Sequence, residues 1–535
     1  MTDAAQPGPR PRLAALAVAL AGCALLAAGL WVSLHYCLAA WKAESDIFVT
    51  VELWRGVSEH GLGFVRSWGY TEDNWLFSLV PLTSLIYAVF DASPRVAVLT
   101  GWLVFLASVG LTGGLAARLS GWRTGLITAG VLLFAPYYAL GPIGFLGYPI
   151  SHNLSMAWGL LALFLALWGI ERRAYGPCVA AALAVFIDTV SDPWAGAAIA
   201  GPLVLASAAL AILNRRSRLG GCALALCLTT AAALWAAYKH PFGTLRFLPR
   251  GHLQLGGLHP ALDNLRYGAR ALEVMFNIAP GGNLEAPAVQ AISLAALAVI
   301  LAAAGGLTLW SLRRATPGRQ LIGGVAILSI GAVAALYVAG PANTGLYVGR
   351  FFPNLYFLGA LLVAMMAGAG WRAWPWPAKA AIAAYAALFV LAGALSGPRY
   401  WTTPLETSEP AEKVALGGFL QAHQLTYGYG PYWGSGGLAM RSLTHGAVTI
   451  RPVVIANGRV ARRPIETSRL WFTPQAEPPD GRPFLVVRAE PPEFPSLEAG
   501  ETAARQQFGE AAERWVYGDS VILVWRRPLA PLIDP

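Results

Sequence analysis

The stretch LAALAVALAGCALLAAGLWVSLHY, residues 13–36, decides the fold class of this chain, because it is mainly apolar and carries no Asp, Glu, Lys or Arg. A helix of about 20 apolar residues is long enough to cross the roughly 30 Å hydrocarbon core of a bilayer. Similar runs recur over most of the chain, and only 12% of the 535 residues are charged, against about 25% in soluble domains. The sequence therefore predicts a polytopic all-α membrane bundle.

The basic residues between the apolar runs predict the orientation of the bundle. They cluster in alternate loops, and such loops are cytoplasmic by the positive-inside rule. The formal net charge of +10 therefore needs no nucleic-acid partner. A cytoplasmic N-terminus followed by eleven crossings places the C-terminal part outside. The predicted spans are residues 13–36, 96–117, 124–141, 154–170, 176–191, 195–213, 220–238, 288–312, 320–340, 353–371 and 378–397. The cytoplasmic clusters contain Arg10, Arg12, Arg118, Arg123, Arg172, Arg173, Arg215, Arg216, Arg218, Arg313, Arg314, Arg319, Arg372 and Lys379.

The apolar segment LFSLVPLTSLIYAVF, residues 76–90, is too short to count as a further span. It contains Pro81, and as a helix it would cover only about 22 Å of the roughly 30 Å core. Counting it would also move every later arginine cluster to the outer face. We therefore expect an interfacial or re-entrant helix there.

The sequence changes character after residue 397. Its apolar runs shorten to strand length in RPFLVVRA (482–489) and SVILVWRR (520–527), and helical patterns lie near 408–423 and 499–508. We therefore predict a membrane domain over residues 1–397 and a small extracytoplasmic α/β domain over residues 398–535. The stretch TYGYGPYWGSGG, residues 426–437, fits either a turn beside an aromatic core or a surface that stacks a sugar.

Acidic residues gather in the first outer loop. Glu44 and Asp46 lie just past the first span, and Glu72 and Asp73 lie in GYTEDNW, residues 69–75. Glu44 and Asp46 either solvate a helix end or pair with Lys42 or Arg55, or act as a base or metal ligand, since a partly desolvated carboxylate can take a proton from a hydroxyl. Glu72 and Asp73 have aromatic neighbours, which fit either solvated acids at a bilayer interface or a sugar-binding face.

Asp188 and Asp192 form a third acidic pair, in FIDTVSDPW, residues 186–194. Their spacing of four would place both on one face of a continuous helix. A carboxylate at membrane depth indicates either a functional site or an ion pair with a neighbouring helix.

Arg350, beside Tyr347 in ANTGLYVGRFFPN (342–354), is a basic residue in a short outer loop, where the orientation rule disfavours it. A guanidinium can form paired hydrogen bonds with phosphate oxygens, so a lipid-linked phosphate at the membrane surface would explain it. An ion pair with an outer-face acid is the alternative.

The long outer loop after the seventh predicted span is rich in cations. It carries Lys239, Arg246 and Arg250, and it continues into a helical pattern over residues 259–276 in which Arg266 and Arg270 share a face. This pattern predicts a basic amphipathic helix in the headgroup plane. Its predicted apolar face comprises Leu262, Leu265, Ala269, Leu272 and Phe276.

Together these features resemble the GT-C superfamily of integral-membrane glycosyltransferases, which use polyprenyl-phosphate sugars. The resemblance covers most of the chain. It rests on the acidic ESD (44–46) after the first span, the short helix within EDNWLFSLVPLTSLIYAVF (72–90), the patterns DASPRVAVLTGWLVF (91–105) and AARLSGWRTGL (116–126), and the outer α/β domain.

The resemblance implies roles for individual residues. Asp46, with Glu44 beside it, stands where the family has a catalytic base or metal ligand, and a divalent ion such as Mg²⁺ or Mn²⁺ stays open. Where related sequences often carry a further acid, this chain has YPISHN (148–153). The predicted donor-phosphate ligands are Arg350, Lys239, Arg246 and Arg250. The predicted substrate-binding residues are Glu72, Asp73, His152, Asn153, Asp188, Asp192 and Tyr347.

The implied activity is an inverting glycosyl transfer at the outer face of a bacterial inner membrane. A hydroxyl of an envelope glycan, lipid or protein would attack the anomeric carbon of a polyprenyl-phosphate sugar. A lipid-borne donor also agrees with the lack of a phosphate-binding Gly-rich loop for a nucleotide sugar. The alternatives are a transporter or flippase of lipid-linked glycans, for which inverted repeats are typical, and a non-catalytic polysaccharide assembly protein.

Overall fold

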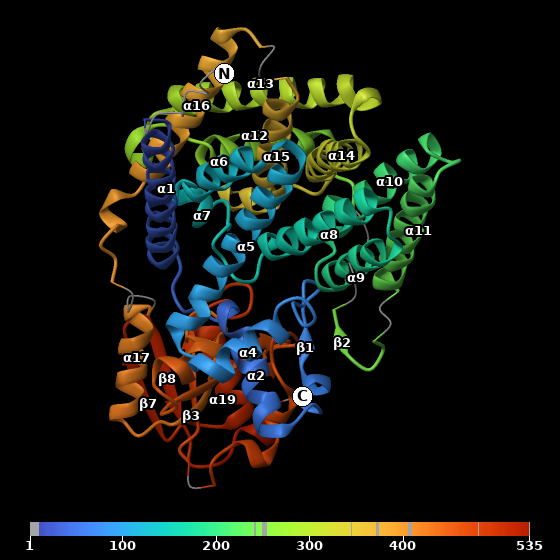
Figure 1. Cartoon of the computed structure of the whole chain (residues 1–535). Coiled ribbons are helices and arrows are strands. Elements are labelled where there is room, and N and C mark those ends of the chain that lie inside the picture. Colours follow the sequence, from blue (N-terminus) through green and yellow to red (C-terminus); the bar gives the residue numbers. More distant parts are fainter. Residues whose placement is uncertain are drawn as a thin grey trace, which may run out of the picture.

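The chain forms a helical bundle with a sheet-containing domain at one end (Figure 1). The computed structural model describes residues 10–239, 242–248, 254–343, 345–370, 374–404, 409–479 and 481–533. The long apolar runs of the sequence become the helices of the bundle. These are α1 (Arg10–Ala40), α5 (Pro94–Ser120), α6 (Trp122–Leu133), α7 (Tyr137–Leu140), α8 (His152–Arg172), α9 (Tyr175–Ser191), α10 (Gly201–Leu213), α11 (Arg218–Tyr238), α13 (Pro287–Ser311), α14 (Pro317–Ala339), α15 (Pro353–Gly370) and α16 (Trp376–Leu395).

Eight helices in the described part of the chain are long and apolar enough to cross a membrane. The protein is therefore an integral membrane protein. Of the three other predicted spans, α9 and α15 are shorter apolar helices. The third predicted span, residues 124–141, is not one continuous helix as we expected.

The interruption in that span follows from Pro136. α6 ends at Leu133 after 12 residues, which is only about 18 Å of helix, and a proline offers no N–H to continue the hydrogen-bond ladder. The chain resumes as the short helix α7. Its Leu140 carbonyl accepts a hydrogen bond at 3.0 Å from Nε1 of Trp41, the residue that follows the end of α1. Two short helices thus replace one long one.

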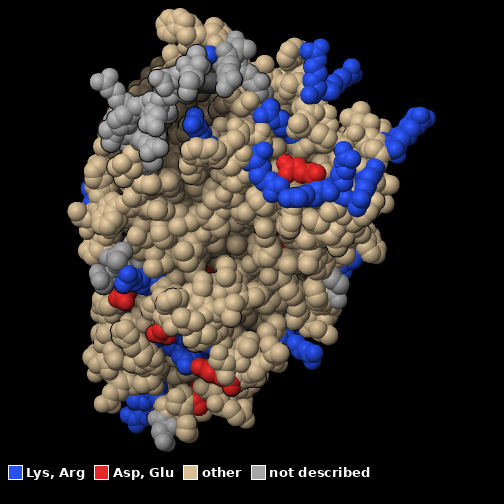
Figure 2. All heavy atoms as spheres, in the orientation of Figure 1, with Lys and Arg blue, Asp and Glu red and all other residues tan. Residues whose placement is uncertain are grey.

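The arginine-rich turns meet at one end of the bundle. Arg118 pairs with Glu171 across two helices, and a recess of about 550 Å³ is lined by both of them together with Arg173, Arg314 and Arg319. Figure 2 shows Lys and Arg side chains gathered at the upper right, away from the C-terminal domain at the bottom of Figure 1. The turns that carry Arg118, Arg173 and Arg319 therefore lie together, as one membrane face requires.

Two further helices lie outside the set of spans. α4 (Val80–Phe90) has 11 residues, matching the predicted short helix. α12 (Leu258–Met275) confirms the predicted helix. Leu262 and Leu265 are exposed, whereas Asn264 and Gly268 are buried. The Asn264 amide bonds to the carbonyls of residues 337, 340 and 341, which makes burial of this polar side chain possible.

The C-terminal domain is a six-stranded sheet between helices. Its strand order is β5-β4-β3-β6-β8-β7, with β3 parallel to β4 and β6 and the other pairs antiparallel. Val486 packs with Leu420 of α17 on one face, and Leu485 and Val487 pack with Ala504 of α19 on the other. The elements are α17 (Ala411–Ala422), β3 (Tyr427–Gly430), α18 (Met440–Leu443), β4 (Thr449–Ala456), β5 (Arg459–Arg462), β6 (Phe484–Arg488), α19 (Leu497–Phe508), β7 (Glu513–Tyr517) and β8 (Ser520–Val524).

The first outer loop docks on this sheet through an apolar cluster. It forms η1 (Asp46–Phe48), α2 (Val49–His60), α3 (Phe64–Ser67) and β1 (Gly69–Tyr70), and β1 pairs in parallel with β2 (Arg246–Phe247). Phe48 and Leu53 belong to one buried cluster with Tyr429 and Tyr432 of the C-terminal domain. The loop between the first two spans therefore packs with the tail, and the predicted domain division at residue 397 stays a prediction.

A buried ion cluster joins the same two parts. Glu52 of α2 bonds to Arg55 at 2.9 Å and to Arg451 of β4 at 2.8 Å, and it is only 2% exposed. The Arg451 guanidinium also lies over the Trp471 ring, 3.9 Å from its centroid. A buried carboxylate with two cationic partners has its charge compensated, so this cluster fixes α2 on the sheet.

Candidate active site

Asp46 and Glu44 diverge toward different partners. The Asp46 Oδ1 atom accepts a hydrogen bond from the Tyr432 hydroxyl at 2.9 Å, and Glu44 Oε1 accepts one from the Tyr148 hydroxyl at 2.9 Å. Ser45, between the two acids, donates to the Tyr432 carbonyl. Asp46 therefore contacts the C-terminal domain, whereas Glu44 contacts the loop that precedes α8.

The surroundings of Asp46 oppose its negative charge. The pKa of Asp46 lies well above its ordinary value, mainly because the side chain is buried and also because the Glu466 and Glu44 carboxylates are near. The Tyr432 hydrogen bond and the cationic Arg463 lower this pKa but do not outweigh those effects. A carboxylate with a raised pKa is a stronger base, provided that it is ionised at the working pH. Asp46 is half-buried, and its position suits a group that exchanges a proton with a ligand.

The group around Asp46 is completed by three residues of the C-terminal domain: Tyr432, Arg463 and Glu466. None of them was predicted as a site residue. The Arg463 guanidinium lies over the Tyr432 ring, 3.8 Å from its centroid. Arg463 also bonds to Glu466 at 2.6 Å and to Glu493 at 2.8 Å. The aromatic stretch at residues 426–437 contained the signal for Tyr432. No local pattern marks Arg463 or Glu466, because their role depends on contacts with the first outer loop.

Glu466 has a strained backbone. Its φ is 54°, in the left-handed region, which costs a non-glycine residue roughly 1–3 kcal/mol. Its N–H donates to the Gly69 carbonyl at 2.7 Å, and a Cβ on Gly69 would lie 2.1 Å from the Pro464 carbonyl oxygen. The close approach of these two segments therefore holds Glu466 in place near Asp46.

A second group combines residues from three predicted segments. His152 Nδ1 lies 2.7 Å from Asp192 Oδ2, which also accepts from the Ser155 hydroxyl at 2.6 Å. Because the ionised carboxylate can only accept, Nδ1 of His152 carries the proton. The His152 ring stacks on Trp194 at 5.1 Å and lies 5.3 Å from Phe351.

Asp73 stands near this second group. Its side chain reaches solvent, yet the protein encloses it enough that desolvation, followed by the Asp192 carboxylate, raises the pKa of Asp73 to about 6 against the opposing effect of His152. Asp73, His152 and Asp192 thus come together as the sequence predicted for outer-face residues.

Arg350 lies next to the same group, in η5 (Leu346–Phe351). Its Cζ atom is 5.3 Å from the Tyr347 ring centroid and 5.2 Å from that of Phe351, which also contacts His152. Its Nε is shielded from solvent without a hydrogen-bond partner among the described residues. Within the described ranges no carboxylate forms a salt bridge with Arg350, so the guanidinium retains donors for a ligand.

Of the other predicted site residues, Asp188 lies beside the second group, because the Asp192 N–H donates to its backbone carbonyl at 2.8 Å. Asp188 is 1% exposed, and neither of its oxygens has a hydrogen-bond partner in the described part of the chain. Since α9 ends at Ser191, Asp188 and Asp192 do not share a continuous helix. Asn153 donates to the Leu146 carbonyl and thereby fixes the loop before α8. Glu72 is half-buried, Lys239 is exposed past the end of α11 and Arg246 lies in β2; Arg250 is outside the described residues.

The described acids do not fit a divalent metal site. Across the ranges that the structure describes, no three His, Cys, Asp or Glu side chains are placed to hold a metal ion. Asp46, Glu44 and Asp192 each accept hydrogen bonds from different partners instead of converging on one point. The Mg²⁺ or Mn²⁺ that the sequence left open thus has no evident ligand set here.

Comparison with known proteins identifies the fold. No protein-family model and no curated protein match this sequence. Among solved structures, the chain is similar to ArnT from Cupriavidus metallidurans in the apo state, with 13% identity, 98% of this chain and 100% of that chain covered, and a TM-score of 0.51. It is also similar to ArnT from Cupriavidus metallidurans bound to undecaprenyl phosphate, with 14% identity, coverages of 97% and 99%, and a TM-score of 0.52.

A third structure is less similar. It is an oligosaccharyltransferase from Archaeoglobus fulgidus in complex with zinc and sulfate, with 13% identity, coverages of 86% and 67%, and a TM-score of 0.45. The two ArnT structures span the whole chain, including the bundle, the first outer loop and the C-terminal sheet domain. This protein therefore shares the fold of ArnT.

Proposed function

We propose that this protein is a membrane glycosyltransferase that moves a sugar from a polyprenyl-phosphate donor to an acceptor hydroxyl at the outer face of the membrane. The observation that carries the proposal is the half-buried Asp46, which Tyr432 holds and whose pKa burial and Glu466 raise. The likeness to ArnT with undecaprenyl phosphate supports a lipid carrier. The acceptor is an envelope glycan, lipid or protein.

The reaction is a single displacement at the anomeric carbon. The acceptor oxygen forms a bond to that carbon while the bond from the carbon to the phosphate oxygen breaks, and its electron pair leaves with the polyprenyl phosphate. Ionised Asp46 takes the acceptor proton, because its partly dry position makes it a stronger base. One displacement inverts the anomeric configuration. Glu44, held by Tyr148, lies beside the base and adds to the negative field that raises its pKa.

Arg350 is the proposed ligand of the departing phosphate. Charge grows on that phosphate in the transition state, and a preorganised cation stabilises it. Tyr347 and Phe351 flank the Arg350 guanidinium, and its Nε has no partner in the described chain. Lys239, Arg246 and Arg250 stay sequence-based candidates for the same phosphate.

The second group is the proposed sugar-binding side of the site. Asp73 and His152 offer an acid and a ring nitrogen, Phe351 lies between His152 and Arg350, and Trp194 supplies an aromatic face beside His152. Sugars are commonly bound by such combinations of hydrogen-bonding and stacking groups. Glu72, Asn153 and Asp188 stay sequence-based candidates for binding the sugar.

The proposed orientation follows from the charge distribution. The arginine-rich end of the bundle is cytoplasmic and the C-terminal domain is extracytoplasmic, in a bacterial inner membrane. Both groups of the site then face outward, where no nucleotide sugar is available, and a lipid-borne donor is required.

The decisive test compares Asp46→Asn with Glu44→Gln in purified protein reconstituted in liposomes. Polyprenyl-phosphate pentoses and hexoses serve as donors, an envelope lipid and glycan extract supplies acceptors, and mass spectrometry measures released polyprenyl phosphate. Loss of the base should lower transfer by about 100-fold or more, and Glu44→Gln should lower it less. Full activity of Asp46→Asn would overturn the assignment of the base. Movement of intact donor across the vesicle membrane without release of polyprenyl phosphate would instead support a flippase.

A further inference from the structure

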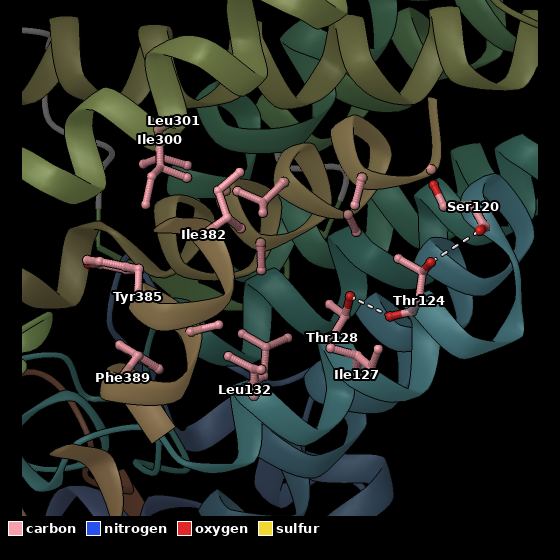
Figure 3. A pocket seen from close by; sticks show the side chains of 18 of the residues that line it. Ser120, Thr124, Ile127, Thr128, Leu132, Ile300, Leu301, Ile382, Tyr385 and Phe389 are labelled. Carbon is pink, nitrogen blue, oxygen red and sulfur yellow. Dashed lines mark hydrogen bonds between the residues drawn. The ribbon is translucent and has the colours of Figure 1, made fainter. Parts of the chain in front are cut away.

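A large apolar cavity lies inside the bundle, away from the candidate site. Its volume is about 1050 Å³, and its walls come from α6, α13, α15 and α16 (Figure 3). α13 and α16 are the least buried of the eight membrane-crossing helices. Ile127 and Trp122 line the cavity and are 66% and 65% exposed, so the cavity opens sideways out of the bundle, where lipid surrounds the protein.

The walls of the cavity are suited to hydrocarbon. Ile300, Leu301, Ile382 and Phe389 form one side (Figure 3). The polar wall residues are mostly satisfied within the protein: Thr128 donates to the Thr124 carbonyl at 2.8 Å and Tyr356 to the Leu132 carbonyl at 2.9 Å. Because these hydroxyls already have partners, an alkyl chain can fill the space without leaving them with unsatisfied hydrogen bonds.

One end of the cavity is polar and basic. Gly121, Trp122, Arg123 and Thr124 line it, and they form the N-terminus of α6. The first N–H groups of a helix have no intrahelical partner and favour an anion. Arg123 is exposed and forms no salt bridge with a described carboxylate.

The dimensions match a lipid of a single leaflet. From Trp122 to Leu132 the wall follows α6 for about 15 Å, half of the roughly 30 Å hydrocarbon core. At roughly 30 Å³ for a group the size of water or a methylene, the cavity has room for about 35 such groups. This is close to the two acyl chains of a glycerophospholipid, whereas an undecaprenyl chain, with eleven five-carbon units, is larger by roughly half.

We propose that this cavity binds an anionic glycerophospholipid from the leaflet at the arginine-rich end. The phosphate group lies against Arg123 and the N-terminus of α6, and the acyl chains occupy the space between α6, α13, α15 and α16. Basic pockets between membrane helices on the cytoplasmic side are suited to anionic headgroups. The site is independent of the proposed sugar transfer, which uses the opposite end of the bundle.

Native mass spectrometry of the full chain, released from micelles with equal amounts of phosphatidylglycerol and phosphatidylcholine, tests the proposal. The wild-type protein should retain phosphatidylglycerol preferentially. Arg123→Gln should lower phosphatidylglycerol affinity by about tenfold, the equivalent of about 1.4 kcal/mol. Arg216→Gln, a matched exposed cation at the same end but outside the cavity, should leave it unchanged.

A cavity-filling pair checks where the acyl chains lie. Ala386→Phe fills the cavity from α16, and Ala384→Phe adds the same ring on an exposed part of that helix that does not line it. The first variant should lose phosphatidylglycerol, and the second should retain it. Equal retention of both lipids by wild type and Arg123→Gln would overturn the proposal. Displacement of phosphatidylglycerol by undecaprenyl phosphate at this site would also overturn it, by assigning the cavity to the donor. The surface variant Arg123→Gln keeps the test decisive if Ala386→Phe fails to fold.

Discussion

The hydroxyl of Tyr432 donates a hydrogen bond to the Asp46 carboxylate at 2.9 Å across 386 residues of sequence. The bond joins the C-terminal domain to the first outer loop at the residue proposed as the base. Glu466 and Arg463 of the same domain set the electrostatic environment of Asp46. The C-terminal domain is therefore part of the candidate active site.

Tyr432→Phe tests whether this hydrogen bond positions the base. The bond favours the ionised form of Asp46, so its loss should raise the pKa of Asp46 further and move the acidic limb of the transfer rate to higher pH. Transfer at the optimum should fall by about tenfold to 100-fold, since hydrogen bonds to charged groups contribute roughly 1.5–3 kcal/mol. Tyr429→Phe is the control, because Tyr429 is buried in the same domain but bonds to Glu477. An unchanged pH profile in folded Tyr432→Phe would contradict the role.

Glu466→Gln should shift the same pH limb in the opposite direction. Its carboxylate raises the pKa of Asp46, so neutralising it should lower that pKa and extend activity to more acidic pH. Glu493→Gln is the matched control, because Glu493 also bonds Arg463 but is not among the groups that act on Asp46. The measurement is kcat/KM against pH. Equal shifts in both variants would indicate that Arg463, and not Glu466, controls the base.

Glu52→Gln tests how the first outer loop is attached. Although burial opposes its charge, Arg451 and Arg55 hold the pKa of Glu52 below its ordinary value of 4.5. A lowered pKa means that the stabilisation is present above that ordinary value and is lost as the pH falls through the folded-state pKa. Breaking this buried cluster should cost about 3–5 kcal/mol, measured as the change in unfolding free energy.

Glu59→Gln, also in α2, provides the comparison for Glu52. Glu59 is 42% exposed and pairs with Arg441 at 2.7 Å, and such a surface pair contributes below about 1 kcal/mol. Similar losses from both substitutions would show that the Glu52 cluster does not attach the loop to the sheet.

Hydropathy and charge predicted the bundle, the short helix before the second span and the outer α/β domain, because these features depend on local composition. They missed the helix break before Pro136, since the apolar run continues past it. The burial of Asn264 on α12 could not be predicted either, because its amide is satisfied by carbonyls about 75 residues away. The pairing of Asp46 with Tyr432 lies beyond any local pattern, since only the docking of the loop on the sheet creates it.

The role of Arg350 separates donor binding from scaffolding. Arg350→Lys keeps the positive charge but loses the planar, paired donors that fit a phosphate. Binding of undecaprenyl phosphate, measured by calorimetry, should weaken by about 1.5–3 kcal/mol, while the melting temperature of the lipid-free protein should stay unchanged. Arg399→Lys is the control, because Arg399 also lies over a tyrosine ring, at 4.6 Å from the Tyr400 centroid, but outside the candidate site. A lower melting temperature with unchanged affinity would assign Arg350 to the scaffold, because the residue would then only pack against Tyr347 and Phe351.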